Sequence, residues 1–156
     1  MSLAISKVPT PVNEPVKSYA PGSPERASLK STLETMASTQ TDMPLVIDGK
    51  DVRTGKLGKA VMPHRHAHVL GEFHQGGAAE VQSAIDAALR AQNDWAALPW
   101  EARASVFLKA ADLLAGPYRD VLNAATMLGQ SKTCHQAEID SACELIDFLR
   151  SFVTRS

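Results

Sequence analysis

The chain has 156 residues and an apolar content of 44%, which is ordinary for one globular domain. A formal net charge of −1 argues against nucleic acid or an anionic membrane as the main partner, because both attract basic surfaces. No apolar run approaches the roughly 18 residues that would suggest a transmembrane helix. The first residues lack the apolar core of a secretory leader, so we expect a cytoplasmic protein, or a mitochondrial matrix protein in a eukaryote.

The first 42 residues are expected to form an arm and a helix. Residues 1–22 hold four prolines, which fix φ and remove hydrogen-bond donors, so they predict an extended, Pro-rich arm. Ser23 is a favoured N-cap and Pro24 suits the first helical position, so a helix should begin here and run to about Ala37. The polar residues 38–42 are interpreted as a linker, which makes residues 23–42 a helix and linker.

The next segment predicts a small antiparallel sheet over residues 44–73. Asp48 and Gly49 separate two short β-prone runs, and a type I′ turn needs residues that tolerate positive φ at both central positions. This pair therefore predicts a β-hairpin. Residues 59–62 and 67–73 are expected to form further strands, and residues 74–77 a turn.

From residue 78 onward the apolar positions repeat with the period of a helix, which predicts four helices over residues 78–150. The last of them begins with a capping box, in which Thr133 is the N-cap and Gln136 stands three residues later. The expected helices begin at or near these residues: Ala78, Pro99, Tyr118 and Thr133. Their apolar stripes need something to pack on, and a few short strands cover only part of them.

Three histidines, His64, His66 and His68, alternate along an expected strand. Residues at this spacing share one face of a strand, so the three side chains could chelate Zn²⁺ or Ni²⁺. No helical His pair, CxxC motif or carboxylate at ligand spacing accompanies them. We therefore expect solvated histidines and no metal site, and keep metal binding as the weaker alternative.

Other motifs supply no catalytic or cofactor-binding residue. The stretch GQSKT at 129–133 is similar to the tail of a phosphate-binding loop, but it lacks the glycine before Lys132. No GxGxxG fingerprint of dinucleotide binding is present. Cys134 and Cys143 would lie roughly 13 Å apart along a helix, too far for a disulfide, so both are expected to be thiols.

The last expected helix carries several carboxylates on an otherwise apolar rod. Asp140 and Glu144 are four residues apart, and like charges at this spacing cost a few tenths of a kcal/mol. One interpretation is a solvated face. The other is a face that lines a polar cleft completed by further chain. The acidic residues are Glu138, Asp140, Glu144 and Asp147.

Three segments make the chain resemble a known family: VNEPVKSYAPGSPER (12–26), FLKAADLLAGPYRDVLNAATMLGQSKT (107–133) and QAEIDSACELIDF (136–148). They resemble the N-terminal part of the aldehyde dehydrogenase superfamily, in the branch that acts on glutamate γ-semialdehyde, over about residues 12–150. The resemblance implies an α/β fold, of which this portion is mostly helical with a small antiparallel sheet. It makes residues 43–156 the N-terminal part of the NAD-binding domain, ending before the nucleotide-binding crossover and the catalytic domain.

The resemblance also implies an activity for the whole enzyme, the NAD-dependent oxidation of L-glutamate γ-semialdehyde to L-glutamate in proline breakdown. In this family a Cys thiolate attacks the aldehyde. That Cys and the NAD site follow the ELIDF segment, so Cys134 and Cys143 do not take the catalytic role. The family glutamate that lines the substrate pocket aligns with Glu144, which we expect to contact the small-molecule substrate.

The ending LRSFVTRS departs from the family pattern and suggests a shortened product. We therefore expect the isolated chain to be inactive, to expose apolar stripes, and to associate with itself or with a missing C-terminal chain. Two alternatives stay open beside this interpretation. One is a non-catalytic interaction module or split-enzyme subunit, and the other is a metal binder that uses the histidine strand.

Overall fold

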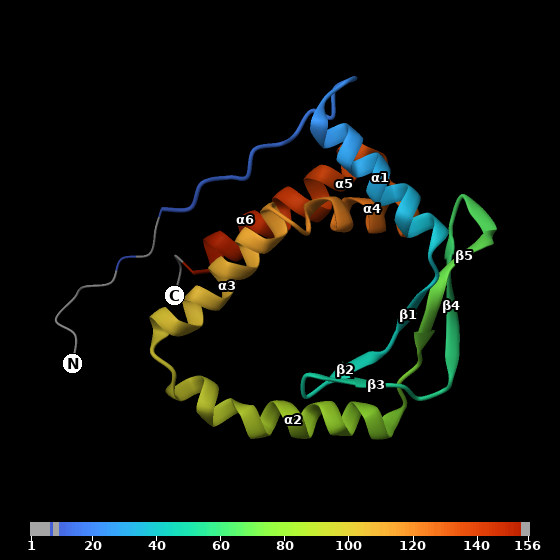
Figure 1. Cartoon of the computed structure of the whole chain (residues 1–156). Coiled ribbons are helices and arrows are strands. Elements are labelled where there is room, and N and C mark those ends of the chain that lie inside the picture. The colour runs from blue at the N-terminus through green and yellow to red at the C-terminus, as the bar shows by residue number, and fades with distance from the viewer. Residues whose placement is uncertain (1–6, 8–9, 154–156) are drawn as a thin grey trace.

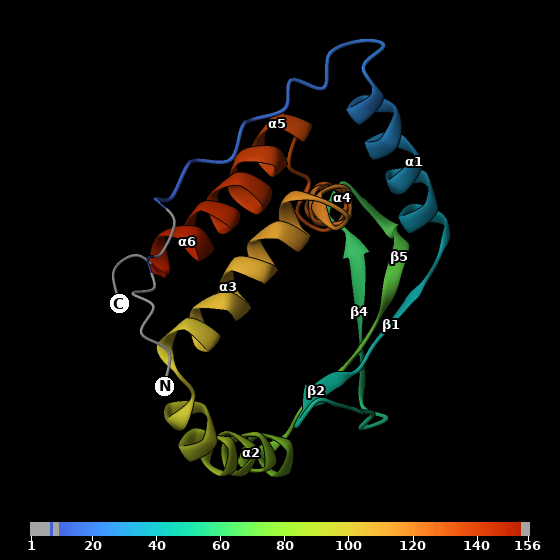
Figure 2. The same cartoon turned by 60° about the vertical axis from the view of Figure 1, so that its left-hand side comes forward.

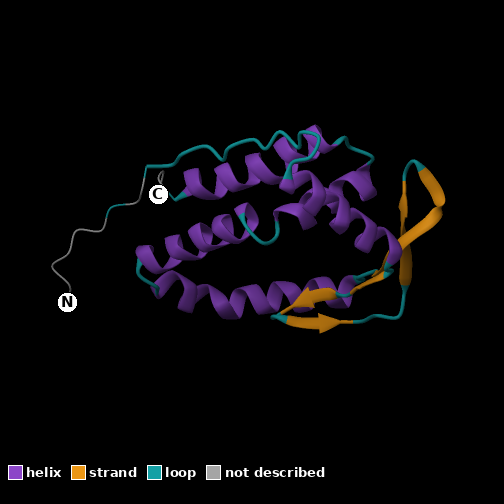
Figure 3. Cartoon of the chain, turned by 45° about the horizontal axis from the view of Figure 1, so that its top comes forward, coloured by secondary structure: helices purple, strands orange, loops and turns teal. Residues whose placement is uncertain are grey.

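The structure is a computed structural model that describes residue 7 and residues 10–153. Its helices are α1 (Pro24–Ser38), α2 (Ala78–Ala97), α3 (Trp100–Ala115), α4 (Arg119–Gln130), α5 (Cys134–Ala137) and α6 (Glu144–Phe152), with a π-helical segment η1 (Glu138–Cys143) between the last two. Its strands are β1 (Thr41–Met43), β2 (Leu45–Ile47), β3 (Lys50–Val52), β4 (Leu57–Met62) and β5 (Arg65–His74). The expectation of a mostly helical portion with little sheet is confirmed, and Figure 3 shows the strands gathered at one end of the molecule.

The helices pack mainly in one group, with α2 set apart from it (Figure 1). The helix α3 runs beside α6, and α1 packs on α4 (Figure 2). One buried cluster joins the arm, α1 and α4 through Tyr19, Leu29 and Ala124. A second joins α3 to the last helical stretch through Ala111, Ala142 and Ile146. The described core therefore lies between the arm, α1, α3, α4 and the end of the chain.

The expected hairpin is confirmed. Strands β2 and β3 pair antiparallel, with Leu45 opposite Val52. Asp48 and Gly49 form the turn with φ values of 55° and 69°, the positive values that a type I′ turn requires. The turn could therefore be predicted from these two residues alone.

The larger sheet differs from the expected antiparallel one. Strands β4 and β5 are antiparallel, but β1 pairs parallel to β5 at its other edge, giving the order β1-β5-β4. The expected linker at 38–42 is therefore partly wrong, because Thr41 and Asp42 belong to β1 and pair with Gly71 and Glu72. Two polar residues in a three-residue strand carry too weak a pattern to distinguish an edge strand from a linker.

The helix starts follow the expected signals. The Ser23 hydroxyl accepts a hydrogen bond from the Arg26 amide at the start of α1. Thr133 and Gln136 form the capping box before α5. The last helical stretch differs from expectation in one respect, because η1 interrupts it with a π-helical turn.

The expected exposure of apolar stripes is confirmed, most clearly on α2. Val81, Ile85 and Leu89 are 58%, 46% and 61% exposed, and Ala87 is the only buried residue among the described residues of α2. In the part of the chain that the structure describes, no helix is long and apolar enough to cross a membrane.

Candidate functional site

Two neighbouring helical segments place opposite charges in the interior. Arg119 is the first residue of α4 and Glu138 the first of η1, and their side chains are 2% and 0% exposed. The Arg119 guanidinium donates to both carboxylate oxygens, from Nη2 to Oε1 and from Nε to Oε2 at 3.2 Å. Asn123, one turn along α4, donates to Oε2 at 2.8 Å. Buried charges persist only when paired and hydrogen-bonded in this way.

The arm completes this buried network. The Lys17 amide donates to Glu138 Oε1 at 2.8 Å, and the Tyr19 hydroxyl donates to Oε2 at 2.9 Å. The Glu14 carboxylate accepts from Arg119 Nη1. Tyr19 adopts a positive φ of 51°, an uncommon conformation for a residue with a large side chain. The arm is therefore fixed to α4 and η1 by specific hydrogen bonds.

The network sets the charge states of its members. Burial alone raises the pKa of Glu138, but hydrogen bonds from Arg119, the Lys17 amide, Asn123 and Tyr19 outweigh it and hold the pKa at about 2. Burial, and then the hydrogen bond to the Glu138 carboxylate, raise the pKa of the Tyr19 hydroxyl. Glu138 is therefore an anion and Tyr19 a neutral donor at neutral pH.

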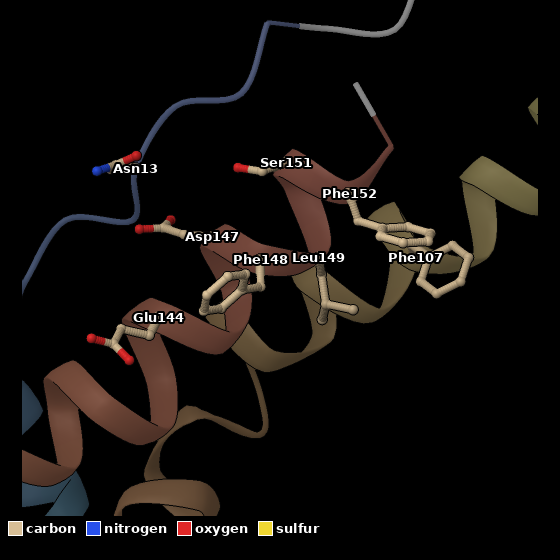
Figure 4. Close-up of a pocket in the computed structure, with 8 residues that line it drawn as sticks. All are labelled: Asn13, Phe107, Glu144, Asp147, Phe148, Leu149, Ser151 and Phe152. Carbon is tan, nitrogen blue, oxygen red and sulfur yellow. The ribbon is translucent and has the colours of Figure 1, made fainter. Parts of the chain in front are cut away.

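A hollow of about 620 Å³ lies along α6, between the arm and Phe107 of α3. Figure 4 shows Glu144, Asp147 and Ser151 directed to one side of the helix, with Asn13 of the arm opposite Asp147. Asp147 Oδ1 accepts a hydrogen bond from the Glu14 amide at 2.7 Å, so the arm forms one edge of the hollow. Its lining residues are Asn13, Phe107, Glu144, Asp147, Phe148, Leu149, Ser151 and Phe152.

The hollow combines acidic and aromatic groups. Phe148 is 71% exposed beside Glu144, and the rings of Phe107 and Phe152 lie 5.2 Å apart at the other end. Carboxylates attract an ammonium group, and aromatic faces favour a cation or a short apolar chain. This wall therefore suits a small ligand that carries an ammonium group on an apolar chain.

The four carboxylates of the final stretch do not share one environment, and Asp140 and Glu144, expected on one face, are separated: of these two, only Glu144 borders the hollow. Glu138 is fully buried in the ion-pair network, while Asp140 is exposed and its Oδ2 lies 2.6 Å from Lys132 Nζ. Glu144 and Asp147 border the hollow. The buried Arg119–Glu138 pair is a feature that the sequence pattern did not reveal, because its partners lie far apart in the chain.

The histidines do not gather as a chelating strand face would require. His64 lies in the turn before β5, where its Nδ1 is 2.7 Å from Ser131 Oγ, so its expected place in a strand is wrong. His68 Nε2 lies 2.7 Å from the Ala37 carbonyl oxygen. Within residues 7 and 10–153, no three His, Cys, Asp or Glu side chains are placed to hold a metal ion.

The N-terminus of α2 is the one described place where a strand, two glycines and a helix follow one another. Such a junction can cradle the phosphates of NAD through free amides. Here the Gly77 amide donates instead to Glu80 Oε2 at 2.7 Å. A carboxylate at this point repels a phosphate, so the junction does not fit NAD. Ser131, in the left-handed region with a φ of 57°, ends α4 as a turn and not as part of a phosphate loop.

Sequence comparison finds close relatives across most of this chain. Delta-1-pyrroline-5-carboxylate dehydrogenase of Agaricus bisporus is 52% identical over 149 residues, which are 95% of this chain and 27% of that protein. The mitochondrial enzyme of the same name from Dictyostelium discoideum is 46% identical over 147 residues, 94% of this chain and 26% of that protein. The chain therefore spans about a quarter of the length of these relatives.

Structural comparison agrees. The crystal structure of the Delta-pyrroline-5-carboxylate dehydrogenase from Mycobacterium tuberculosis, bound with NAD and cobalamin, matches with a TM-score of 0.95 and 52% identity, covering 98% of this chain and 29% of that one. The sequence profile of the aldehyde dehydrogenase family matches residues 52–156. On these grounds the chain belongs to the aldehyde dehydrogenase family.

Proposed function

We propose that this chain is the N-terminal portion of an NAD-dependent enzyme that oxidises L-glutamate γ-semialdehyde, the open form of Δ1-pyrroline-5-carboxylate, to L-glutamate in proline breakdown. The observation that carries the proposal is the TM-score of 0.95 at 52% identity to an enzyme of that name. In this proposal the sequence beyond the chain supplies the reactive Cys and the NAD site. The isolated chain is then inactive.

Glu144 is the residue that this chain contributes to the substrate. Glutamate γ-semialdehyde carries an ammonium and a carboxylate on one carbon, joined to the aldehyde by a short apolar chain. The acidic wall of Glu144 and Asp147 suits the ammonium end, and Phe148 suits the apolar chain. The same wall repels the substrate carboxylate, which must be held by residues outside this chain.

The test joins residues 1–148 of this chain to the matching downstream part of the Agaricus bisporus relative. We expect the joined protein to form NADH from glutamate γ-semialdehyde and NAD, and the 156-residue chain alone to form none. The substitution Glu144→Gln should raise the KM for the semialdehyde about tenfold, the size expected when a charge-assisted hydrogen bond is lost. Asp140→Asn, on the same helical stretch but outside the hollow, is the matched control.

Two results would contradict the proposal. NADH formation by the isolated chain would show that it needs no downstream part. A joined protein that folds and binds NAD but does not oxidise the semialdehyde would contradict the proposed substrate.

A split-enzyme subunit is the second candidate, and the exposed stripe of α2 favours it. It predicts that a separately produced downstream chain co-purifies with this one and restores NADH formation on mixing. Co-purification without activity would favour a non-catalytic interaction module. The compartment, cytoplasm or mitochondrial matrix, stays a prediction that fractionation of the source cells would decide.

A further inference from the structure

At η1 the last helical stretch changes which of its side chains lie on the buried side of the helix. Ala137 and Ile146 are nine residues apart, which is about 900° along a regular α-helix, so they would lie on opposite sides. Both are nevertheless 0% exposed. The π turn closes hydrogen bonds over five residues and accommodates one extra residue, which reduces the angle between their two directions, Ala137 facing α4 and Ile146 facing α3. At its end the Glu144 amide donates to the Ile139 carbonyl, five residues back.

The same turn decides where Glu144 points. Glu144 follows Ala137 by seven residues, and a regular α-helix returns to nearly the same face after seven. An uninterrupted helix would therefore direct Glu144 toward the face on which Ala137 is buried, where α5 packs on α4. In the structure Glu144 is exposed and borders the hollow shown in Figure 4.

Arg119 contacts both ends of the π turn. Its guanidinium donates to Glu138 and, from Nη2, to Cys143 Sγ at 3.5 Å. Glu138 and Cys143 are five residues apart, so a regular α-helix would separate their directions by about 140°. In a π turn residues at this spacing lie on one face. A single guanidinium can therefore bridge them only while the π turn is present.

We infer that Arg119 is a positioning residue, which keeps the π turn by bridging Glu138 and Cys143 and thereby directs Glu144 into the substrate hollow. The inference rests on the proposed function for its effect on substrate. Arg119 does not touch the hollow, since it is buried between α4, η1 and the arm. Its effect on catalysis is transmitted through the orientation of Glu144.

The test uses the joined protein described above and the double substitution Arg119→Met/Glu138→Met. Replacing both partners removes the bridge without leaving a fully buried charge unpaired, a change that proteins often tolerate, since Glu14, the other partner of Arg119, is 11% exposed. We expect the KM for glutamate γ-semialdehyde to rise about tenfold, as for Glu144→Gln, with kcat changed less than about twofold. The KM for propanal, which has no ammonium group, should stay constant.

Tyr19→Phe is the matched control. It removes one arm hydrogen bond to Glu138 but leaves the bridge from Arg119 to Glu138 and Cys143 in place. Its KM for the semialdehyde should stay within about twofold of the parent value, because the orientation of Glu144 is kept. Arg119→Lys keeps the positive charge but lacks the planar guanidinium. It should raise the KM for the semialdehyde less than the double substitution does.

The outcomes separate the inference from the proposed function. If Glu144→Gln raises the KM and the double variant does not, the inference fails and the proposed function stands. If the double variant raises the KM for propanal equally, Arg119 has a general structural role and the inference fails. If Glu144→Gln has no effect, the proposed substrate role of Glu144 fails, and the orientation of residue 144 is then judged on the chain alone.

That second measurement uses the 156-residue chain with Cys134→Ser and Glu144→Cys, and tandem mass spectrometry assigns the label to residue 144 or to the remaining thiol, Cys143. We expect iodoacetamide to label the thiol at 144 quickly in the parent and at least about tenfold more slowly in the double Met variant. A reporter at Asp140→Cys, before the end of the turn, should keep its rate. Equal labelling at 144 in both backgrounds would overturn the inference, even if the joined protein proved unstable.

Discussion

Glu138 keeps a full negative charge inside the protein because six hydrogen-bond donors surround its two carboxylate oxygens, one of them the Cys143 thiol at 3.9 Å. The other five are the Lys17 backbone amide, the Tyr19 hydroxyl, the Asn123 side-chain amide and two nitrogens of Arg119. Removing Arg119 alone would leave this charge unpaired in the interior, which typically costs about 3 to 5 kcal/mol. The pair is thus more costly to break than to replace as a whole.

The depressed pKa of Glu138 predicts a pH dependence of stability. The pKa falls from its ordinary value of 4.5 to about 2 on folding, so the stabilising contribution is complete above pH 4.5 and is lost as the pH falls toward 2. We expect Glu138→Gln to be less stable than the parent at pH 6, and the difference to shrink at pH 3. Urea unfolding at both pH values measures it. A constant difference between the two pH values would contradict the assignment.

Single residues with local roles could be predicted from the sequence, whereas Glu138 could not. The cap at Ser23 and the turn at Asp48 and Gly49 depend on neighbours within three residues. The partners of Glu138 lie 19 residues away at Arg119 and 121 residues away at Lys17. A carboxylate on an apolar helix gives the same pattern whether it faces water or a distant cation.

Among the elements, β1 depends on one glycine for its place in the sheet. A Cβ at Gly71 would lie 2.2 Å from the Thr41 carbonyl oxygen and 2.7 Å from the Met43 side chain. Such distances are impossible without moving the backbone of β1. The parallel edge strand can therefore pair with β5 only where β5 has no side chain at this position.

The expected result of Gly71→Ala is the loss of β1 from the sheet, with β4 and β5 still paired. The amides of residues 41–43 should then exchange with solvent faster, and the protein should lose about 1 to 3 kcal/mol of stability. Hydrogen exchange and urea unfolding measure the two effects. Gly129→Ala is the control, since a Cβ there meets no atom within 4 Å and alanine favours the α4 helix. Equal protection of β1 in both variants would contradict the prediction.

The boundaries of most helices could be predicted, but the π turn could not. Helix starts carry caps, and helix ends carry Gly or Pro, so α1, α2 and α5 begin where expected. The residues of η1 contain no Pro or Gly and fit a regular helix by composition. In our inference the turn is set by the tertiary bridge from Arg119 to Glu138 and Cys143. Because the local sequence does not show the π turn, it does not show which way Glu144 points. Its substrate role was therefore inferred from a family resemblance and stays a prediction.

At the scale of the whole chain, burial is uneven. The group of α1, α3, α4 and the last helical stretch contains both buried clusters, whereas α2 and the hairpin contribute little to them. Exposed apolar side chains on α2 make a continuous stripe along one helix. Apolar stripes of this kind favour association in water.

We expect the purified chain to self-associate through this stripe. Val81→Gln combined with Leu89→Gln should weaken association about tenfold, since it removes two large apolar side chains from the contact. Sedimentation velocity over a range of concentrations gives the measurement. Val12→Gln, at an exposed apolar position of the arm, should leave association unchanged. A chain that stays monomeric throughout, with a sharp melt and no ANS binding, would contradict this prediction.

The attachment of the arm also has a consequence for synthesis on the ribosome. Lys17 of the arm is made 121 residues before Glu138, whose carboxylate accepts the hydrogen bond from the Lys17 amide. At a translation rate of about 5 to 20 residues per second, the arm must wait roughly 6 to 24 s before it can dock. During that interval Arg119 emerges before Glu138, so α4 is made before the anion that its Arg119 and Asn123 bind. Within residues 10–153, arm docking therefore follows the synthesis of η1 and is one of the later steps in the folding of this part.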